Sequence, residues 1–115
     1  MKKVTVTTTD GKQYVLTFNR KTAAMFGDMG YRVGDITNDG KAFTAVPVFV
    51  WCALKANHPT IRKDKAEEVW DALSPKSKSK VLDALVDMYA ATYTELMGSE
   101  NDEDDEGNAS VEFEE

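Results

Sequence analysis

The single histidine and the single cysteine of this 115-residue sequence are the first candidates for acid–base or nucleophilic catalysis. His58 lies between Asn57 and Pro59, with no serine or cysteine at the spacing of a catalytic motif. We interpret it as a residue at the C-terminal end of a helix, where an imidazole interacts favourably with the helix dipole. Cys52 lies in the most apolar stretch of the sequence, which favours a buried, unreactive thiol. One histidine and one cysteine also cannot form a structural zinc site of the usual kind.

The acidic segment 102–107 has some of the residue types of a calcium-binding loop. It supplies the first, third, fifth and sixth positions of an EF-hand. The twelfth position, where a bidentate glutamate belongs, is Phe113, and Glu112 stands one place short. No helix pattern flanks the segment, so we predict only weak, nonspecific binding of cations.

The glycines do not form a nucleotide-binding loop. Gly27, Gly30 and Gly34 do not link a strand to a helix as in the dinucleotide-binding motif, and no phosphate-loop lysine pattern occurs. No pair of carboxylates lies on a strongly apolar face, as an acid–base couple would. We therefore expect a protein that is not an enzyme and that has no catalytic, cofactor-binding or metal-binding residues.

Charge is distributed unevenly along the chain. Residues 1–98 contain 14 basic and 11 acidic residues, whereas residues 99–115 contain nine acidic residues and no basic one, which together give the net charge of −6. A body with an excess of three positive charges and no arginine stripe does not favour nucleic-acid binding. Residues 99–115 have too few apolar side chains to fold alone. We predict a folded domain at 1–98 and a disordered acidic tail at 99–115.

The apolar residues favour a cytoplasmic protein. The longest apolar stretch, 45–54, is about half as long as a membrane span requires. The alternation of valine and threonine after the start of the chain lacks the apolar core of a secretory signal. The single cysteine leaves no internal disulfide. We expect neither membrane insertion nor secretion.

The first elements predicted are two strands. Valines alternate with threonines at 4–7, and a second alternating run follows at 14–18, with a turn signal between them. A three-residue loop that ends at Gly11 pairs Val4 with Leu16 and keeps the apolar residues on one face. It also places this glycine where a bulge requires the left-handed conformation.

Four helices are predicted after this hairpin. The first spans 20–29, with Asn19 as N-cap and Gly30 just beyond its end, and a loop follows it. The second begins at the N-cap Thr44, has Pro47 in its first turn and ends before the Asn-His-Pro sequence. It is apolar on nearly all sides, as is typical of a central, buried helix.

The last two helices follow closely. The third runs from Asp64, in a capping-box arrangement, to Leu73, and we expect it to bury Trp70. The fourth has Ser74 as N-cap with proline after it, carries a continuous apolar stripe, and ends at Gly98. The predicted fold class is α+β, mainly α, with an N-terminal β-hairpin, a bundle of about four helices and the disordered acidic tail.

A series of short motifs between residues 14 and 97 resembles a known family. The motifs are the run 14–22, Met25, Gly30-Tyr31, an apolar helix that ends in His58-Pro59, Ile61-Arg62-Lys63, Glu68-Val69-Trp70, and Leu82 through Met88-Tyr89. In this order they resemble the small tail assembly chaperones of long-tailed bacteriophages, in the branch found largely in phages of Gram-positive hosts.

The resemblance implies a non-enzymatic binding protein. Such chaperones coat the hydrophobic, helical tape measure protein and keep it soluble in the host cytoplasm until the tail tube polymerises around it, and they are absent from the mature virion. The implied partners are the tape measure protein and the tail tube protein, with self-association also open.

A chaperone of this kind needs an exposed apolar groove. The second and fourth helices have more apolar surface than a small bundle easily covers. Each residue of this surface also has an interpretation as core. We place the partner-binding groove on the following six residues: Phe49, Val50, Trp51, Leu54, Tyr89 and Tyr93.

Two other classes of function stay open at this point. One is a small acidic inhibitor that mimics nucleic acid and blocks a host protein, for which the acidic tail supplies the charge. The other is a structural protein of the phage tail or of head completion, which would share the size and helix content.

Overall fold

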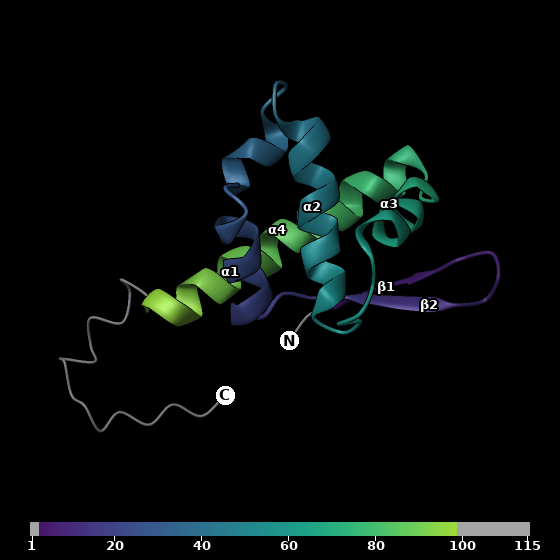
Figure 1. The fold of residues 1–115 in the computed structure, drawn as a ribbon, viewed down its shortest axis with the longest axis horizontal. Helices are drawn as coiled ribbons and strands as arrows, with labels where there is room; N and C mark the ends of the chain where they lie inside the picture. Colours follow the sequence, from purple (N-terminus) through teal and green to yellow (C-terminus); the bar gives the residue numbers. More distant parts are fainter. Residues whose placement is uncertain (1–2, 99–115) are drawn as a thin grey trace.

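A hairpin and a set of helices make up residues 3–98, the part of the chain that the computed structural model describes (Figure 1). The acidic tail predicted at 99–115 lies outside these residues. In chain order, the elements are β1 (Val4–Thr7), β2 (Gln13–Leu16), α1 (Arg20–Asp28), the short 3₁₀ helix η1 (Val33–Thr37), α2 (Ala42–Lys55), α3 (Lys63–Asp71) and α4 (Pro75–Met97). The predicted fold class, a β-hairpin followed by four α-helices, is confirmed for this part of the chain.

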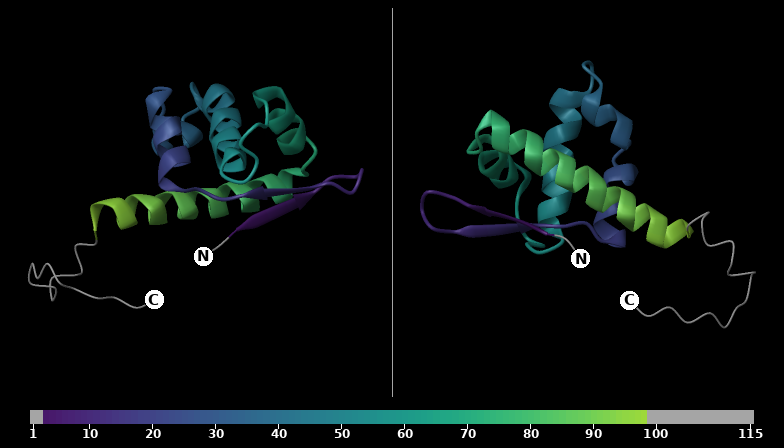
Figure 2. Two further views of the ribbon diagram at one scale, coloured as in Figure 1. Left: turned by 60° about the horizontal axis from the view of Figure 1, so that its bottom comes forward. Right: turned by 180° about the vertical axis from the view of Figure 1, so that it is seen from behind.

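The elements form two layers. Figure 2 shows α1, α2 and α3 side by side in one layer, with α4 and the hairpin running beneath them in the other. Contacts join α2 to both of its neighbours in the layer, and join β2 to α2 and α1 to α4 across the layers. The core therefore lies around α2, between the two layers.

Helix α2 has the most buried residues of the four α-helices, as its apolar sequence predicts, although its first turn is exposed and Trp51 is half-buried. Seven of its 14 residues are buried. Phe18, Phe26 and Tyr89 place their rings around Phe49, with ring centroids 4.8, 4.9 and 5.7 Å from it. These rings come from the segment after β2, from α1 and from α4, so the second helix holds three parts of the chain together.

The hairpin has the predicted register. Val4 lies opposite Leu16 and Val6 opposite Tyr14. Gly11 ends the three-residue loop with a φ of 85°, in the left-handed region that glycine adopts without steric cost. The buried face of the hairpin carries valine, tyrosine and leucine, which pack on the core.

Helix α1 ends in the turn predicted at Gly30. This glycine has a φ of 93°, and its N–H donates to the carbonyl of Gly27 at 2.8 Å. The N–H of Tyr31 donates to the carbonyl of Phe26 at 3.3 Å, and their rings stack with centroids 5.5 Å apart. The two bonds and the apolar contact form a Schellman motif. At the other end, Asn19 is the N-cap, as predicted.

The start of α2 differs from the prediction. The helix begins at Ala42, so Thr44 is its third residue and not its N-cap, and Pro47 lies in the second turn. The cause is Asn38, whose carbonyl accepts from the N–H groups of Lys41 and Ala42 at 2.9 and 2.8 Å and starts the helical turn early. The segment before it also contains η1, although the whole stretch was predicted to be a loop.

The start of α3 also differs. Its N-cap is Arg62, and Asp64 lies in the first turn. The carboxylate of Asp64 accepts from the N–H of Lys65 at 2.8 Å, and Glu67 forms an ion pair with Lys63 at 2.8 Å instead of closing a capping box. The helix ends at residue 71, two residues before the predicted end.

The predicted limits of α4 are confirmed. The Ser74 hydroxyl accepts from the N–H of Ser77 at 3.2 Å, and proline occupies the first position of the helix. Gly98 follows the last helical residue with a φ of 83°. The result is a single helix of 23 residues.

Two glycine substitutions test the end of α1. Neither Gly27 nor Gly30 has an atom within 4 Å of an added Cβ, so backbone conformation alone sets the effect. Gly30→Ala should lower the free energy of unfolding by about 1–2 kcal/mol, because an L-residue is strained in the left-handed region. Gly27→Ala should raise it by about 0.5–1 kcal/mol, because glycine is a poor residue inside a helix. Urea denaturation measures both, and shifts of the same sign would contradict the assignment of this turn.

Candidate functional site

Three of the six residues predicted to bind a partner are not on the surface. Phe49, Val50 and Leu54 are 0, 1 and 0% exposed. This part of the predicted groove is therefore wrong for the folded chain, because α1, α4 and the segment after β2 pack against this side of α2. The three residues form the core on which the site depends.

Trp51 is half-buried and has a structural contact. Its indole N–H donates to the carbonyl of Ile61 at 3.0 Å, and the Lys55 ammonium lies 5.4 Å from the ring centroid. The hydrogen bond fixes the segment that connects α2 to α3. We therefore assign Trp51 to this connection and not to the candidate site.

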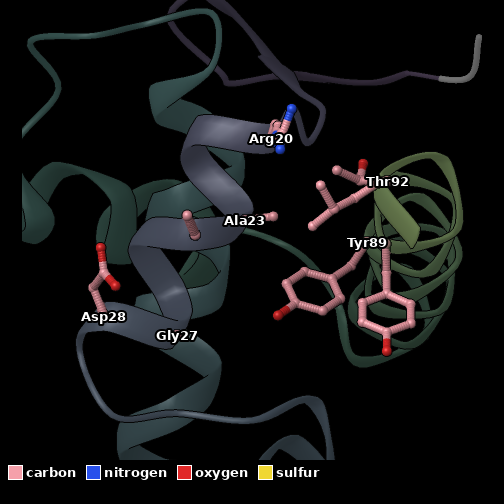
Figure 3. A pocket seen from close by; sticks show the side chains of 9 residues that line it. Arg20, Ala23, Gly27, Asp28, Tyr89 and Thr92 are labelled. Atoms are coloured by element: carbon pink, nitrogen blue, oxygen red, sulfur yellow. The ribbon is translucent and has the colours of Figure 1, made fainter.

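Tyr89 and Tyr93 both line a groove between α1 and α4. Figure 3 shows this groove, with Tyr89 and Thr92 of α4 opposite Ala23 of α1. We call it the α1–α4 groove, and it has a volume of about 350 Å³. Its lining consists of Arg20, Ala23, Ala24, Gly27 and Asp28 from α1 and Tyr89, Thr92, Tyr93 and Leu96 from α4.

The α1–α4 groove exists because one of its walls has small side chains. Ala23, Ala24 and Gly27 lie at helical spacing along α1 and leave space opposite the tyrosines of α4. Sequence reasoning missed this wall, because Gly27 was considered only as part of a nucleotide-binding loop, which it does not form. The signal was present in the spacing of the three small residues.

Tyr89 and Tyr93 have different roles in the groove. The ring of Tyr89 packs edge-on against Phe18 and Phe26, with centroids 5.4 and 6.0 Å apart, and burial raises the pKa of its phenol. These ring contacts hold Tyr89 in place, so that it forms a fixed part of the groove lining. Tyr93 is 59% exposed and available for contact.

The apolar surface continues along α4 beyond the groove. Leu96 and Met97 are 49 and 62% exposed, and they lie in the last turn of the helix. Figure 1 shows this end of α4 extending past α1, where no other helix of residues 3–98 covers it. Exposed apolar residues that cluster in this way are typical of a binding surface.

A smaller hollow lies between the first half of α2 and the end of α3. Phe43, which is 92% exposed, lines it together with Val46, Pro47 and Trp70. The predicted burial of Trp70 is confirmed only in part, because its ring packs against the core and remains partly exposed. The hollow has a volume of about 280 Å³.

His58 has a structural contact that sequence reasoning missed. Its Nε2 accepts from the N–H of Val15 at 2.9 Å, and the Asn57 amide donates to the Val15 carbonyl at 3.3 Å. The N–H of Thr17 donates to the carbonyl of Ala53 at 3.1 Å. These bonds join the outer edge of β2 and the residue after it to the last turn of α2 and the residues that follow this helix. His58 therefore stabilises the edge of β2 through a hydrogen bond. The sequence analysis had assigned it instead an interaction with the dipole of its own helix.

Cys52 is buried as predicted. Its side chain is fully inside the core, and burial raises the pKa of the thiol to about 11. Within residues 3–98, no group of histidine, cysteine and carboxylate side chains is arranged to hold a metal ion. In the same residues, no helix combines the length and apolar character that a membrane crossing needs. The acidic run 102–107 lies outside this part of the chain.

The buried thiol gives a simple test of the core. At pH 8 the thiolate fraction of Cys52 in the folded chain should be about one hundredth of that in the unfolded chain, because burial raises its pKa from 9.0 to about 11. Reaction with a chromogenic disulfide should be slow in buffer and rapid in concentrated urea. Rapid modification of one thiol per folded chain would contradict this packing around α2.

Comparison with known proteins gives one match. No curated protein and no solved structure matches the chain. A family model described as "Domain of unknown function (DUF5055)" matches residues 1–114. Because this match spans nearly the whole sequence, the chain belongs to the DUF5055 family.

Proposed function

We propose that this protein is a non-enzymatic chaperone that binds apolar helical segments of a larger client in the α1–α4 groove. The client we propose is the tape measure protein of a long-tailed phage, which the chaperone keeps soluble in the host cytoplasm until the tail tube polymerises. The client class follows from the resemblance of motifs in the sequence. The observation that supports a binding role is the exposed apolar surface of Tyr93, Leu96 and Met97 beside the groove.

The dimensions of the groove suit a short helical segment with one or two anchoring side chains. The lining residues of α4 extend from Tyr89 to Leu96, which is about 10 Å along a helix. A client helix would present residues at positions i, i+3, i+4 and i+7 to a groove of this length. The small side chains of α1 allow the backbone of the client helix to approach α1 closely.

Opposite charges at the two ends of α1 would orient the client. Arg20 lies at the first position of this helix and Asp28 at the last, and both line the groove. A helix that docks with its N-terminus near Asp28 and its C-terminus near Arg20 has favourable contacts with both charges. Each contact contributes about 0.3–1 kcal/mol at an exposed site, so orientation would be a preference and not a strict requirement.

Weak single contacts are compatible with this role. A groove of two helical turns binds one segment weakly, and a long client with many apolar segments binds many copies at once. Each copy can then be displaced by a tube subunit without breaking the whole complex. The affinity for the client would come from the number of segments on it.

Co-expression with the tape measure protein of the same genome tests the proposal. The client should be soluble with this protein, in a complex that contains several copies per client. Tyr93→Glu and Leu96→Glu should weaken the complex at least about tenfold, because each places a charge in the apolar surface. Phe43→Glu is the matched control, since this residue is 92% exposed and does not line the groove.

Circular dichroism should show that all three variants remain folded. A client that is equally insoluble with and without this protein would contradict the chaperone function and favour an inhibitor that mimics nucleic acid. Recovery of the chain from purified phage particles would favour a structural protein of the tail or head.

A further inference from the structure

The acidic segment 99–115 follows α4 in the sequence, and Leu96 near the end of α4 lines the α1–α4 groove. We propose that its last residues, 111–115, dock in this groove of the same chain. In this arrangement Val111 and Phe113 contact the apolar lining, and the acidic residues around them face Arg20 and Lys21. The docking is independent of the proposed function, and only the competition with a client described below depends on it.

The apolar residues of the tail point to the groove as its docking site. Val111 and Phe113 are the only sizeable apolar side chains in 99–115, and they lie two positions apart. In an extended segment, residues at this spacing project to the same side. A groove of about 350 Å³ between Ala24 and Tyr93 offers space for one or two such side chains.

Charge favours the same site. Residues 112, 114 and 115 are glutamates, so the two apolar side chains lie among negative charges. The first turn of α1 has Arg20 and Lys21 and no acidic residue, and it is also the positive end of the helix dipole. An acidic segment therefore meets an attractive end of the groove at Arg20.

The length of the tail fits this site. Leu96 lines the groove and lies two residues before Gly98, and Val111 lies thirteen positions after Gly98. A chain of that length spans about 20 Å on average, which exceeds the roughly 10 Å of the groove along α4. The lysines near the start of α4, such as Lys78, are about 30 Å from Gly98 along the helix. They are less accessible to the tail than Arg20.

Because the tail belongs to the same chain, weak contacts are sufficient. A short linker of this kind gives an effective concentration in the millimolar range, so a segment with a dissociation constant of about 1 mM would occupy the groove about half of the time. A client with several segments would displace it readily. The tail would thus reduce the exposure of the apolar groove about twofold when no client is bound.

Nuclear magnetic resonance of the full chain tests the docking. Phe113→Asp removes the larger apolar side chain, and Asn101→Asp is a matched control that adds the same charge elsewhere in the tail. Phe113→Asp should shift the backbone amide resonances of Ala24, Gly27, Tyr93 and Leu96, whereas the control should leave them unchanged. The shifts should be the same over a roughly tenfold range of protein concentration, because the contact lies within one chain.

Three results would overturn the inference. The first is identical spectra for the two variants at the groove residues. The second is a shift that depends on concentration, which would assign the tail to the groove of a second copy. The third is a set of shifts confined to Lys76, Lys78 and Lys80, which would place the tail at the other end of α4.

The client assay separates this inference from the proposed function. If both hold, each groove of Phe113→Asp should bind the client about twofold more tightly than that of Asn101→Asp, because an internal competitor that occupies the groove half of the time is lost. Shifts at the groove without any client binding would support the docking and reject the chaperone function. Client binding with unchanged spectra would support the function and reject the docking.

Discussion

The need to cover the apolar faces of α2 determines where the other elements lie. A helix with apolar residues around its whole circumference is stable in water only when neighbours remove each face from solvent. In this protein α1 and α3 flank it within one layer, and β2 and α4 lie beneath it. Each neighbour needs only one apolar face for this purpose. Phe49, at the centre of the aromatic cluster, therefore contacts rings from three separate parts of the chain.

The candidate site arises from a difference in length between helices. Helix α4 has 23 residues and is about 34 Å long, whereas α2 has 14 residues and is about 21 Å long. The core can cover only the part of α4 that lies along it. The surplus at the C-terminal end keeps the apolar stripe, and Tyr93, Leu96 and Met97 remain exposed there. Small residues on α1 then turn the crossing of the two helices into a groove.

Local signals in the sequence were sufficient for the hairpin register and for the ends of α1 and α4, because turn chemistry and capping act over a few residues. The start of α2 could not be predicted, since Asn38 forms the first turn from outside the apolar stretch. The binding surface was harder still. Phe49 and Tyr93 are both aromatic residues in the apolar part of a predicted helix. Their exposure differs because elements from distant parts of the sequence pack over Phe49 and not over Tyr93. The bond between His58 and Val15 joins residues 43 positions apart and has no local signal.

That bond also affects the order in which the chain folds during translation. A hairpin of two four-residue strands is marginal by itself, and its outer edge gains partners only when Asn57 and His58 are present. A ribosome adds the 43 residues between Val15 and His58 in about two to nine seconds. During this interval the two bonds to Val15 from Asn57 and His58 cannot both form. The N-terminal hairpin is therefore synthesised first but stabilised only after the central helix is complete.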